Sequence, residues 1–237
     1  MTRLEIQAAV AKIGKYASSE SGDTVEMVER PHGGISLVVV DGQRSGRSAK
    51  IISNLVARKA LSLLAEGVRD GAVARATHDY LRTHRGGKVS AELTIVSVDL
   101  TTRTLVISRN SRCPVFLRRG GQIEWLSETC DALGIHPNTK PAITEIAVEA
   151  GLTVAVFTDG ILAAGSRGGS GMDMDAVIGE IDGDGNAPAQ VLADGILAKA
   201  LALDSQRPQD DCTVLVVKLV ANHLSDDIRR LAVSFPI

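Results

Sequence analysis

Residues 35–42 have the sequence ISLVVVDG, an almost continuous apolar run that stops at Asp41-Gly42. A run of this kind, rich in β-branched side chains, is typical of a strand that is covered on both faces. The pattern returns in residues 152–160, LTVAVFTDG, which end at Asp159-Gly160. The sequence therefore predicts two buried strands that each finish on an Asp-Gly pair.

Shorter segments on either side of these runs show strand and helix patterns. Residues 6–13 and 24–29 have the two-residue alternation of half-buried strands. Residues 46–66 carry apolar side chains at helical spacing and precede Gly67, which is placed to end that helix. The remaining pattern predicts a helix at 70–84, a β-meander at 91–99, 104–109, 114–118 and 122–126, strands at 143–148 and 213–220, and helices at 174–181 and 188–204.

Many short antiparallel strands with helices between them indicate an α+β fold rather than a doubly wound parallel sheet. Two antiparallel sheets packed face to face, with helices outside, account for the number of strands and give a four-layer α/β/β/α sandwich. A length of 237 residues suits one large domain, and no stretch has the composition of a linker. We expect a single domain over residues 1–237, with a C-terminal extension over about 220–237 that holds a turn of helix and an edge strand.

The composition is that of an ordinary globular protein and argues against several classes of function. Charged residues make up 23% of the chain and the formal net charge is -2, which is not the profile of a nucleic-acid-binding protein. Residues 1–16 lack the long apolar segment of a signal peptide or membrane span, so we expect no membrane partner and a cytoplasmic location. Three widely spaced cysteines fit neither a disulfide framework nor a zinc cluster.

Three acidic positions stand at the ends of apolar strands: Asp41, Asp159 and the pair Asp210-Asp211. Magnesium and manganese prefer oxygen ligands, and carboxylates at strand ends can converge between two sheets without disturbing the strands. A glycine after the aspartate lets the backbone approach closely, so that a peptide carbonyl can also face a metal. Asp-Gly is also a common turn dipeptide, and it recurs at residues 70–71, 182–183, 184–185 and 194–195. The pattern by itself leaves both a two-metal site and a set of turns open.

These positions belong to an ordered set of short motifs: SGD at residues 21–23, VVDG at 39–42 followed by Gly46, FTDGI at 157–161 and PQDDCT at 208–213. Their order and spacing resemble the PPM-type (type 2C) metal-dependent serine/threonine phosphatases, and within them the bacterial SpoIIE-like branch that acts on sporulation and stress regulators. The resemblance covers about residues 6–219. It includes RNSRCP at 109–114, where that branch usually carries an Asn-Ala-Gly-His-type turn.

The resemblance implies a β-sandwich flanked by helices, with two manganese or magnesium ions at one end. The catalytic residues would be Asp41, Asp159 and Asp210. Asp41 would bridge both ions, the carbonyl of Gly42 would bind one of them, and Asp159 and Asp210 would bind the other. The metals would activate a water for in-line attack on phosphorus, with no phosphoenzyme.

Five neighbouring residues complete the site that the resemblance implies. Asp23 would hold a metal-bound water, and Asp211 is expected to orient its loop. Gln43 stands where animal members of the family have a histidine that can donate a proton to the leaving oxygen. The phosphate-binding arginine of those enzymes has no clear match, and Arg44 and Arg47 are either its replacement or solvated surface residues.

We therefore expect a metal-dependent protein serine/threonine phosphatase. Its substrates would be phosphorylated stress or sporulation regulatory proteins of bacteria, by family analogy those of the STAS type. The main alternative is a catalytically weak or inactive module that keeps the fold and binds phosphoprotein regulators, because Gln43 cannot donate a proton as histidine does. A two-metal hydrolase of small phosphate esters is a third possibility.

Overall fold

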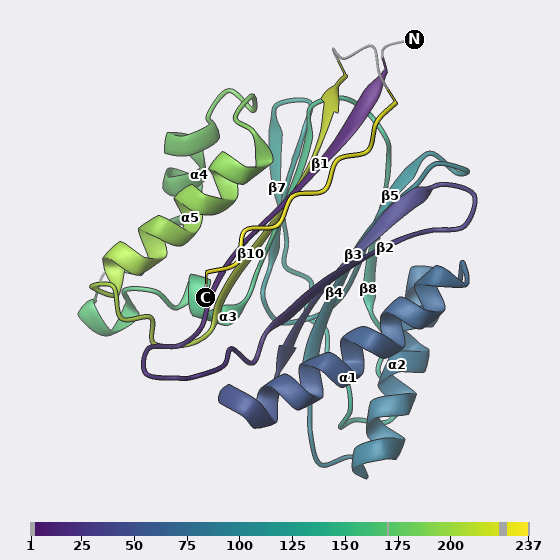
Figure 1. Cartoon of the computed structure of the whole chain (residues 1–237), viewed down its shortest axis with the longest axis vertical. Helices are drawn as coiled ribbons and strands as arrows, with labels where there is room; N and C mark the ends of the chain where they lie inside the picture. The colour runs from purple at the N-terminus through teal and green to yellow at the C-terminus, as the bar shows by residue number, and fades with distance from the viewer. Residues whose placement is uncertain (1–2, 170, 223–226, 237) are drawn as a thin grey trace.

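Two five-stranded antiparallel sheets lie face to face, and helices cover the outer face of each (Figure 1). The structure is a computed structural model that describes residues 3–169, 171–222 and 227–236. The layers follow the order α, β, β, α, so the fold class predicted from the sequence is confirmed. No helix in the described part of the chain is long and apolar enough to cross a membrane.

The first sheet contains strands from the beginning, middle and end of the chain. Its strand order is β1 (Leu4–Ile13), β10 (Cys212–Ala221), β9 (Leu152–Phe157), β6 (Val115–Arg119) and β7 (Gln122–Leu126). Its outer face is covered by α4 (Met174–Asp182) and α5 (Ala189–Leu203), and β9 is followed by the short helix α3 (Asp159–Leu162) and a 3-10 turn (Ser166–Gly168). The edge strands of this sheet are therefore β1 and β7.

The second sheet is built from the first half of the chain and one later strand. Its order is β2 (Thr24–Glu29), β3 (Gly34–Gly42), β4 (Ala91–Asp99), β5 (Thr104–Asn110) and β8 (Ala142–Ala147). Helices α1 (Gly46–Ala65) and α2 (Asp70–Arg85) pack on its outer face. The edge strands of this sheet are β2 and β8.

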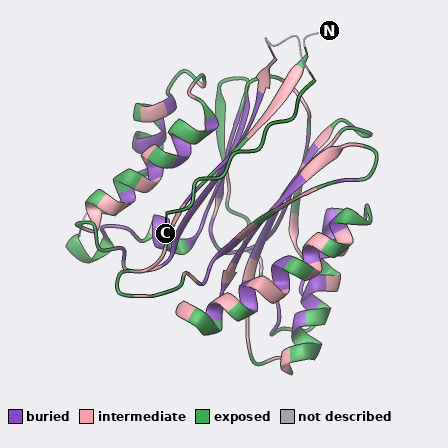
Figure 2. Ribbon diagram, viewed as in Figure 1, coloured by how far each residue is buried: buried purple, intermediate pink, exposed green. Residues whose placement is uncertain are grey.

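The apolar run of β3 is buried on both sides, as its sequence predicts. Leu37 and Val39 belong to the core between the sheets, whereas Val38 and Val40 pack in the core under α1 and α2. Strand β9 divides its side chains in the same way, between the inter-sheet core and the core under α4 and α5. Figure 2 shows both strands as buried segments inside the layers. This double coverage fixes where the two strands end.

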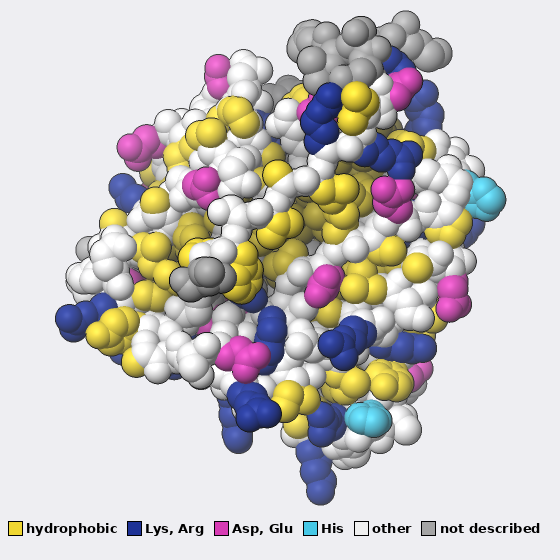
Figure 3. All heavy atoms as spheres, viewed as in Figure 1, with side chains coloured by type: hydrophobic (Ala, Val, Ile, Leu, Met, Phe, Trp, Pro, Cys, Tyr) yellow, Lys and Arg dark blue, Asp and Glu magenta, His cyan; other side chains and the backbone are white. Residues whose placement is uncertain are grey.

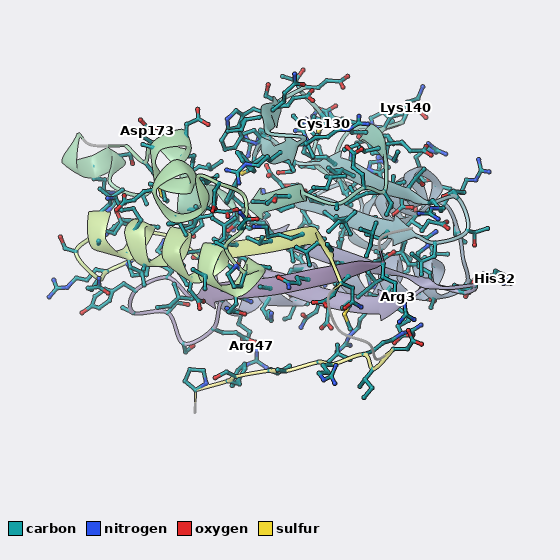
Figure 4. All side chains as sticks on the ribbon, turned by 90° about the horizontal axis from the view of Figure 1, so that it is seen from above. Arg3, His32, Arg47, Cys130, Lys140 and Asp173 are labelled. Atoms are coloured by element: carbon teal, nitrogen blue, oxygen red, sulfur yellow. The ribbon has the colours of Figure 1, made fainter. Side chains whose placement is uncertain are left out.

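Three features differ from the sequence predictions. The strands expected to form one β-meander divide between the two sheets, because β4 pairs with β5 in the second sheet whereas β6 pairs with β7 in the first, and no local pattern marks the crossing between them. The sequence pattern does not predict α3, because four residues are too few to show helical periodicity. In the C-terminal extension, the described residues 227–236 form neither the expected turn of helix nor the expected edge strand. Leu231, Val233 and Phe235 alternate with small residues as in a strand, but all three are exposed and no described sheet edge pairs with them. Figure 4 shows this segment running outside the layers, where Arg229 pairs with Glu29 of β2. The part of the prediction on residues 223–226 and 237 lies outside the described residues.

A buried charge cluster attaches the end of α4 to the first sheet. Lys218 of β10 donates hydrogen bonds to Asp182 Oδ2 over 2.8 Å and to the carbonyls of Gly185 and Ala187. Arg118 of β6 donates to the same carboxylate oxygen over 3.1 Å. All three charged side chains are almost completely buried. Because two cations share one carboxylate away from water, Asp182 is the group that offsets their repulsion.

Asp182→Ala is expected to lower the free energy of unfolding by about 3–5 kcal/mol, because it leaves two buried cations without a carboxylate. Urea denaturation followed by circular dichroism measures the change. Glu149→Ala is the matched control, since it removes the carboxylate of the exposed Arg119–Glu149 pair and should cost no more than about 1 kcal/mol. Equal losses in the two variants would contradict the role given to the cluster.

Candidate metal centre

The acidic residues predicted from the sequence meet at one end of the sandwich, where strands from both sheets finish. Asp41 lies at the end of β3 in the second sheet, and Asp159 begins α3 directly after β9 of the first sheet. Asp210 lies in the loop that leads into β10, the hydrogen-bonded neighbour of β9. The two sheets face each other across one core, so their strand ends bring together carboxylates that are far apart in the sequence.

A fourth carboxylate lies beside Asp41. Glu92 of β4 is the cross-strand partner of Asp41, and both residues line a small cavity of about 10 Å³ together with Ser111 and Thr158. A cavity of that size is close to the smallest that holds a single water molecule. A larger cavity, about 260 Å³, lies between the edge strands β7 and β8 and is lined by none of the predicted ligands. The small cavity is therefore the one that belongs to the acidic end.

Close backbone contacts, rather than turns, require the glycines of the two Asp-Gly pairs. A Cβ atom on Gly42 would lie 2.2 Å from the carbonyl oxygen of Ala49 in α1, and one on Gly160 would lie 2.2 Å from that of Asp211. Neither glycine has a positive φ angle. Gly42 thus lets α1 pack against the end of β3, and Gly160 lets the loop before β10 pack against α3. The turn interpretation that the sequence left open does not account for these two pairs.

The surroundings of Asp41 disfavour its ionised form. Burial, followed by the charges of Asp23, Asp159, Glu92 and Asp210, raises the pKa of Asp41 to about 9. These are the two causes expected where several carboxylates share a poorly hydrated site. A bound cation would remove the repulsion and favour the ionised form, so the cluster has the electrostatic character of a cation site.

Asp23 and Asp211 occupy the loops behind this cluster. Asp23 is 1% exposed, and its Oδ2 accepts hydrogen bonds from the hydroxyls of Thr158 over 3.0 Å and Thr213 over 2.6 Å. Burial raises the pKa of Asp23 to about 7, although these two hydrogen bonds oppose the shift. Asp211 accepts a hydrogen bond from the backbone N–H of Gly22 over 2.8 Å. Asp211 therefore holds in place the loop that carries Asp23.

Arg112 brings a positive charge to the acidic end. Its Nε donates to Glu92 Oε1 over 3.0 Å, and the hydroxyl of Ser111 donates to Glu92 Oε2 over 2.5 Å. Burial, Asp210 and Glu92 raise the pKa of Asp159, whereas the nearby charge of Arg112 lowers it in part. The side chain of Arg112 is 84% exposed, so its guanidinium group is open to solvent beside the carboxylates.

The residues that follow Asp41-Gly42 lie at the surface. The side chains of Arg44 and Arg47 are exposed and make no hydrogen bond or ion pair with any described residue. Figure 4 shows Arg47 at the outer side of the molecule. Gln43 accepts a hydrogen bond at Oε1 from the backbone N–H of Ser90, and its own N–H donates to the Ser90 carbonyl. The side chain of Gln43 thus joins the end of β3 to the residue before β4.

Glu92, Ser111 and Arg112 are the site residues that the sequence prediction missed as members of the acidic end. Glu92 gives a weak signal, since it is an acidic residue next to the start of an otherwise apolar strand. Ser111 and Arg112 belong to the motif at 109–114, but nothing in that motif indicates which strand it faces. Only the pairing of β3 with β4 and of β4 with β5 brings these residues to Asp41.

The donor set suits a hard divalent cation in its chemistry, because it consists of carboxylate oxygens. The carboxylate groups, however, do not surround a common position. Across residues 3–169, 171–222 and 227–236, no group of three or more His, Cys, Asp or Glu side chains is arranged so that it could hold a metal ion. A cation held by several of these carboxylates would require their side chains to turn toward a common position.

Comparison with known proteins finds relatives over most of the chain. A family model described as Stage II sporulation protein E (SpoIIE) matches residues 31–220. Stage II sporulation protein E of Bacillus subtilis (strain 168) is 21% identical over 217 residues, which are 92% of this chain and 26% of that protein. The chain thus spans about a quarter of the length of this curated relative.

Solved structures share the fold. The PP2C phosphatase domain of SpoIIE from Bacillus subtilis, solved with a fragment of its regulatory domain, superimposes with a TM-score of 0.80 at 19% identity, over 94% of this chain and 66% of that chain. RsbX in complex with magnesium gives a TM-score of 0.68 at 17% identity, over 92% of this chain and 100% of that chain. The catalytic domain of the serine/threonine phosphatase PstP in complex with two manganese ions gives 0.69 at 17% identity, with the same coverage.

The stability of the metal-free protein should depend on Asp41 and on pH. The folded-state pKa of Asp41, about 9, exceeds its ordinary value of 3.8, so the aspartate destabilises the fold increasingly as pH rises between these values. Asp41→Asn should raise the melting temperature in EDTA at pH 8 by about 3 °C or more, the shift that about 1 kcal/mol produces in a domain of this size.

Thermal denaturation at pH 5.5 and pH 8 measures this effect, and the gain should be larger at pH 8. Asp194→Asn on the exposed side of α5 is the control and should change the melting temperature little at either pH. A gain for Asp41→Asn that does not grow with pH would contradict the electrostatic account of the cluster.

Proposed function

The chain belongs to the SpoIIE family, and on that premise we propose that it is a metal-dependent protein serine/threonine phosphatase. The observation that carries the proposal is that Asp41, Asp159 and Asp210 come from two sheets to one end of the sandwich, where the charges of Asp159 and Asp210 help to raise the pKa of Asp41. Its substrates would be phosphoserine and phosphothreonine on bacterial stress or sporulation regulatory proteins.

Two divalent cations, manganese or magnesium, are the proposed cofactors. The neighbours RsbX and PstP were solved with magnesium and with two manganese ions, which supports this choice. Asp41, the carbonyl of Gly42, Asp159 and Asp210 are the proposed ligands, with Asp41 shared between the ions. When bound, the cations would lower the pKa of a coordinated water and neutralise charge on the phosphoryl oxygens.

Asp23 is the proposed residue that orients the attacking water. Its Oδ2 is held by Thr158 and Thr213, whereas its Oδ1 has no hydrogen-bond partner among the described residues. The free oxygen can therefore accept a hydrogen bond from a water between Asp23 and Asp41. A pKa near 7 also suits a group that takes up a proton from this water at neutral pH.

Arg112 is a candidate for binding the phosphoryl group, in addition to Arg44 and Arg47. A guanidinium group can donate two parallel hydrogen bonds to phosphate oxygens. Arg112 is anchored by Glu92, and its charge already acts on Asp159. Arg44 and Arg47 lie in the exposed loop after Gly42 and have no such anchor among the described residues.

The second candidate function is a phosphoprotein-binding module with weak or no turnover. The observation that favours it is the position of Gln43, whose side chain is bound to the backbone of Ser90 and cannot supply a proton to a leaving group. In an active enzyme, water would have to protonate the leaving serine or threonine oxygen.

Hydrolysis of para-nitrophenyl phosphate and of a phosphoserine protein should require manganese or magnesium. Asp41→Ala and Asp159→Ala should each reduce turnover at least about 100-fold, because each removes a proposed metal ligand. Release of inorganic phosphate measures the rates, and Asp194→Ala on α5 is the control for an exposed aspartate. Absence of turnover by the unmodified protein with every divalent metal tested would refute the enzyme and favour the binding module.

The three arginines can be separated by steady-state kinetics. Arg112→Ala should raise the KM for para-nitrophenyl phosphate about tenfold, the effect of one lost charge-assisted hydrogen bond, because this arginine is anchored beside Asp159. Arg44→Ala and Arg47→Ala should change this KM less. A larger effect at either loop arginine than at Arg112 would return the phosphate-binding role to the loop.

A further inference from the structure

Two lysine side chains meet on a single carbonyl oxygen next to the acidic end. Lys12 of β1 donates a hydrogen bond to the carbonyl of Asp23 over 2.5 Å, and Lys50 of α1 donates to the same oxygen over 2.6 Å. The two ammonium groups therefore lie within about 5 Å of each other. Lys50 also donates to the hydroxyl of Thr24 over 2.9 Å.

Neither lysine forms a close ion pair within the described part of the chain. No carboxylate oxygen there lies within 4.0 Å of either ammonium nitrogen, and both side chains are partly buried. Burial and the charge of Lys50 lower the pKa of Lys12 to about 8, although the charges of Asp23 and Asp211 oppose the shift. The contrast with Lys218 is clear, because that buried lysine is paired with the carboxylate of Asp182. Two neighbouring ammonium groups with no carboxylate bound directly to either are suited to bind an external anion.

The pair contacts the backbone of Asp23 and not its carboxylate. The carboxylate of Asp23 points to Thr158 and Thr213, at the ends of β9 and β10, whereas its carbonyl oxygen points to the two lysines. Lys12 comes from β1 and Thr24 begins β2, and these are the edge strands on one side of the sandwich. The lysines are therefore beside the site but not among the carboxylates that surround Asp41.

The surface around the pair is also basic. Arg44 and Arg47 precede Lys50 closely in the sequence, and both are exposed. Helix α1 has no acidic residue in its first turn. Figure 3 shows Lys and Arg side chains gathered over the lower part of this face of the molecule. An anionic group that approaches along this edge would meet a positive potential before it reaches the lysines.

We propose that Lys12 and Lys50 form a subsite for a second anionic oxygen group of the polypeptide substrate, next to the phosphoserine but distinct from the phosphoryl group that reacts. The group would be a carboxylate or a second phosphate, since both present oxygens to paired ammonium groups. This inference rests on the proposed function and adds to it a determinant of substrate choice: phosphoserine in an acidic or multiply phosphorylated segment.

Three peptides of equal length test the subsite: a phosphoserine flanked by asparagines, the same phosphoserine flanked by aspartates, and one with a second phosphoserine in place of the aspartates. For the unmodified protein, kcat/KM for at least one anionic peptide should exceed that for the asparagine peptide about tenfold. Comparison of the two anionic peptides identifies the preferred source of the charge.

Lys12→Met and Lys50→Met should each reduce this selectivity ratio by about threefold or more, while Lys12→Arg and Lys50→Arg should retain it. Lys199→Met on the exposed side of α5 is the matched control and should keep the ratio of the unmodified protein. Melting temperatures show whether each variant is folded, and the arginine variants separate loss of charge from loss of structure.

A ratio near one in the unmodified protein, or a full ratio in both methionine variants, would overturn the proposal. It would also be overturned if the variants weakened inhibition by inorganic phosphate as much as they reduced the ratio, because the pair would then bind the reacting group. If no peptide is hydrolysed, the proposed phosphatase activity fails by itself, and binding of the fluorescently labelled peptides, measured by anisotropy, tests the same ratio without turnover.

Discussion

Negative charge gathered at one end of the sandwich is the constraint on which the arrangement of the surrounding elements depends. Burial, followed by the charges of neighbouring carboxylates that include Glu92, raises the pKa of Asp41 and of Asp159. Such a cluster is unfavourable for folding, and the rest of the domain must offset it. It persists because β3 and β9 are covered on both faces, so that their ends cannot separate without exposing the inter-sheet core.

The loops around the cluster are fixed by short-range contacts that hold their backbone in place. Gly42 admits the backbone of α1, and Gly160 admits the backbone of Asp211, at distances that no side chain would permit. Asp211 in turn holds the loop that carries Asp23, whose carboxylate is bound by two threonine hydroxyls. A site built in this way keeps its acidic residues in place while their side chains remain able to turn toward a cation.

Positive groups flank the acidic end on two sides. Arg112 reaches it from the turn after β5, and the Lys12–Lys50 pair reaches it from the edge formed by β1 and β2. Buried Lys218, by contrast, is paired directly with the carboxylate of Asp182. In the proposed function, a phosphorylated polypeptide would lie across the carboxylates and the flanking cations together.

The sequence by itself determined the layers of this protein and the positions of its main acidic residues. Runs such as residues 35–40 and 152–157 must be buried on both faces, and their Asp-Gly ends are visible as motifs, because both properties are local to a few consecutive residues. Tertiary structure decided the rest. Glu92 lies beside Asp41 only because of the register between β3 and β4. Lys12 of β1 and Lys50 of α1 come together only at the carbonyl oxygen of Asp23. The side chain of Gln43 accepts a hydrogen bond from the backbone of Ser90. The alternating apolar side chains at residues 231–235 do not pair with a sheet edge among the described strands. These outcomes depend on contacts between segments distant in sequence, and no local pattern specifies which segments those will be.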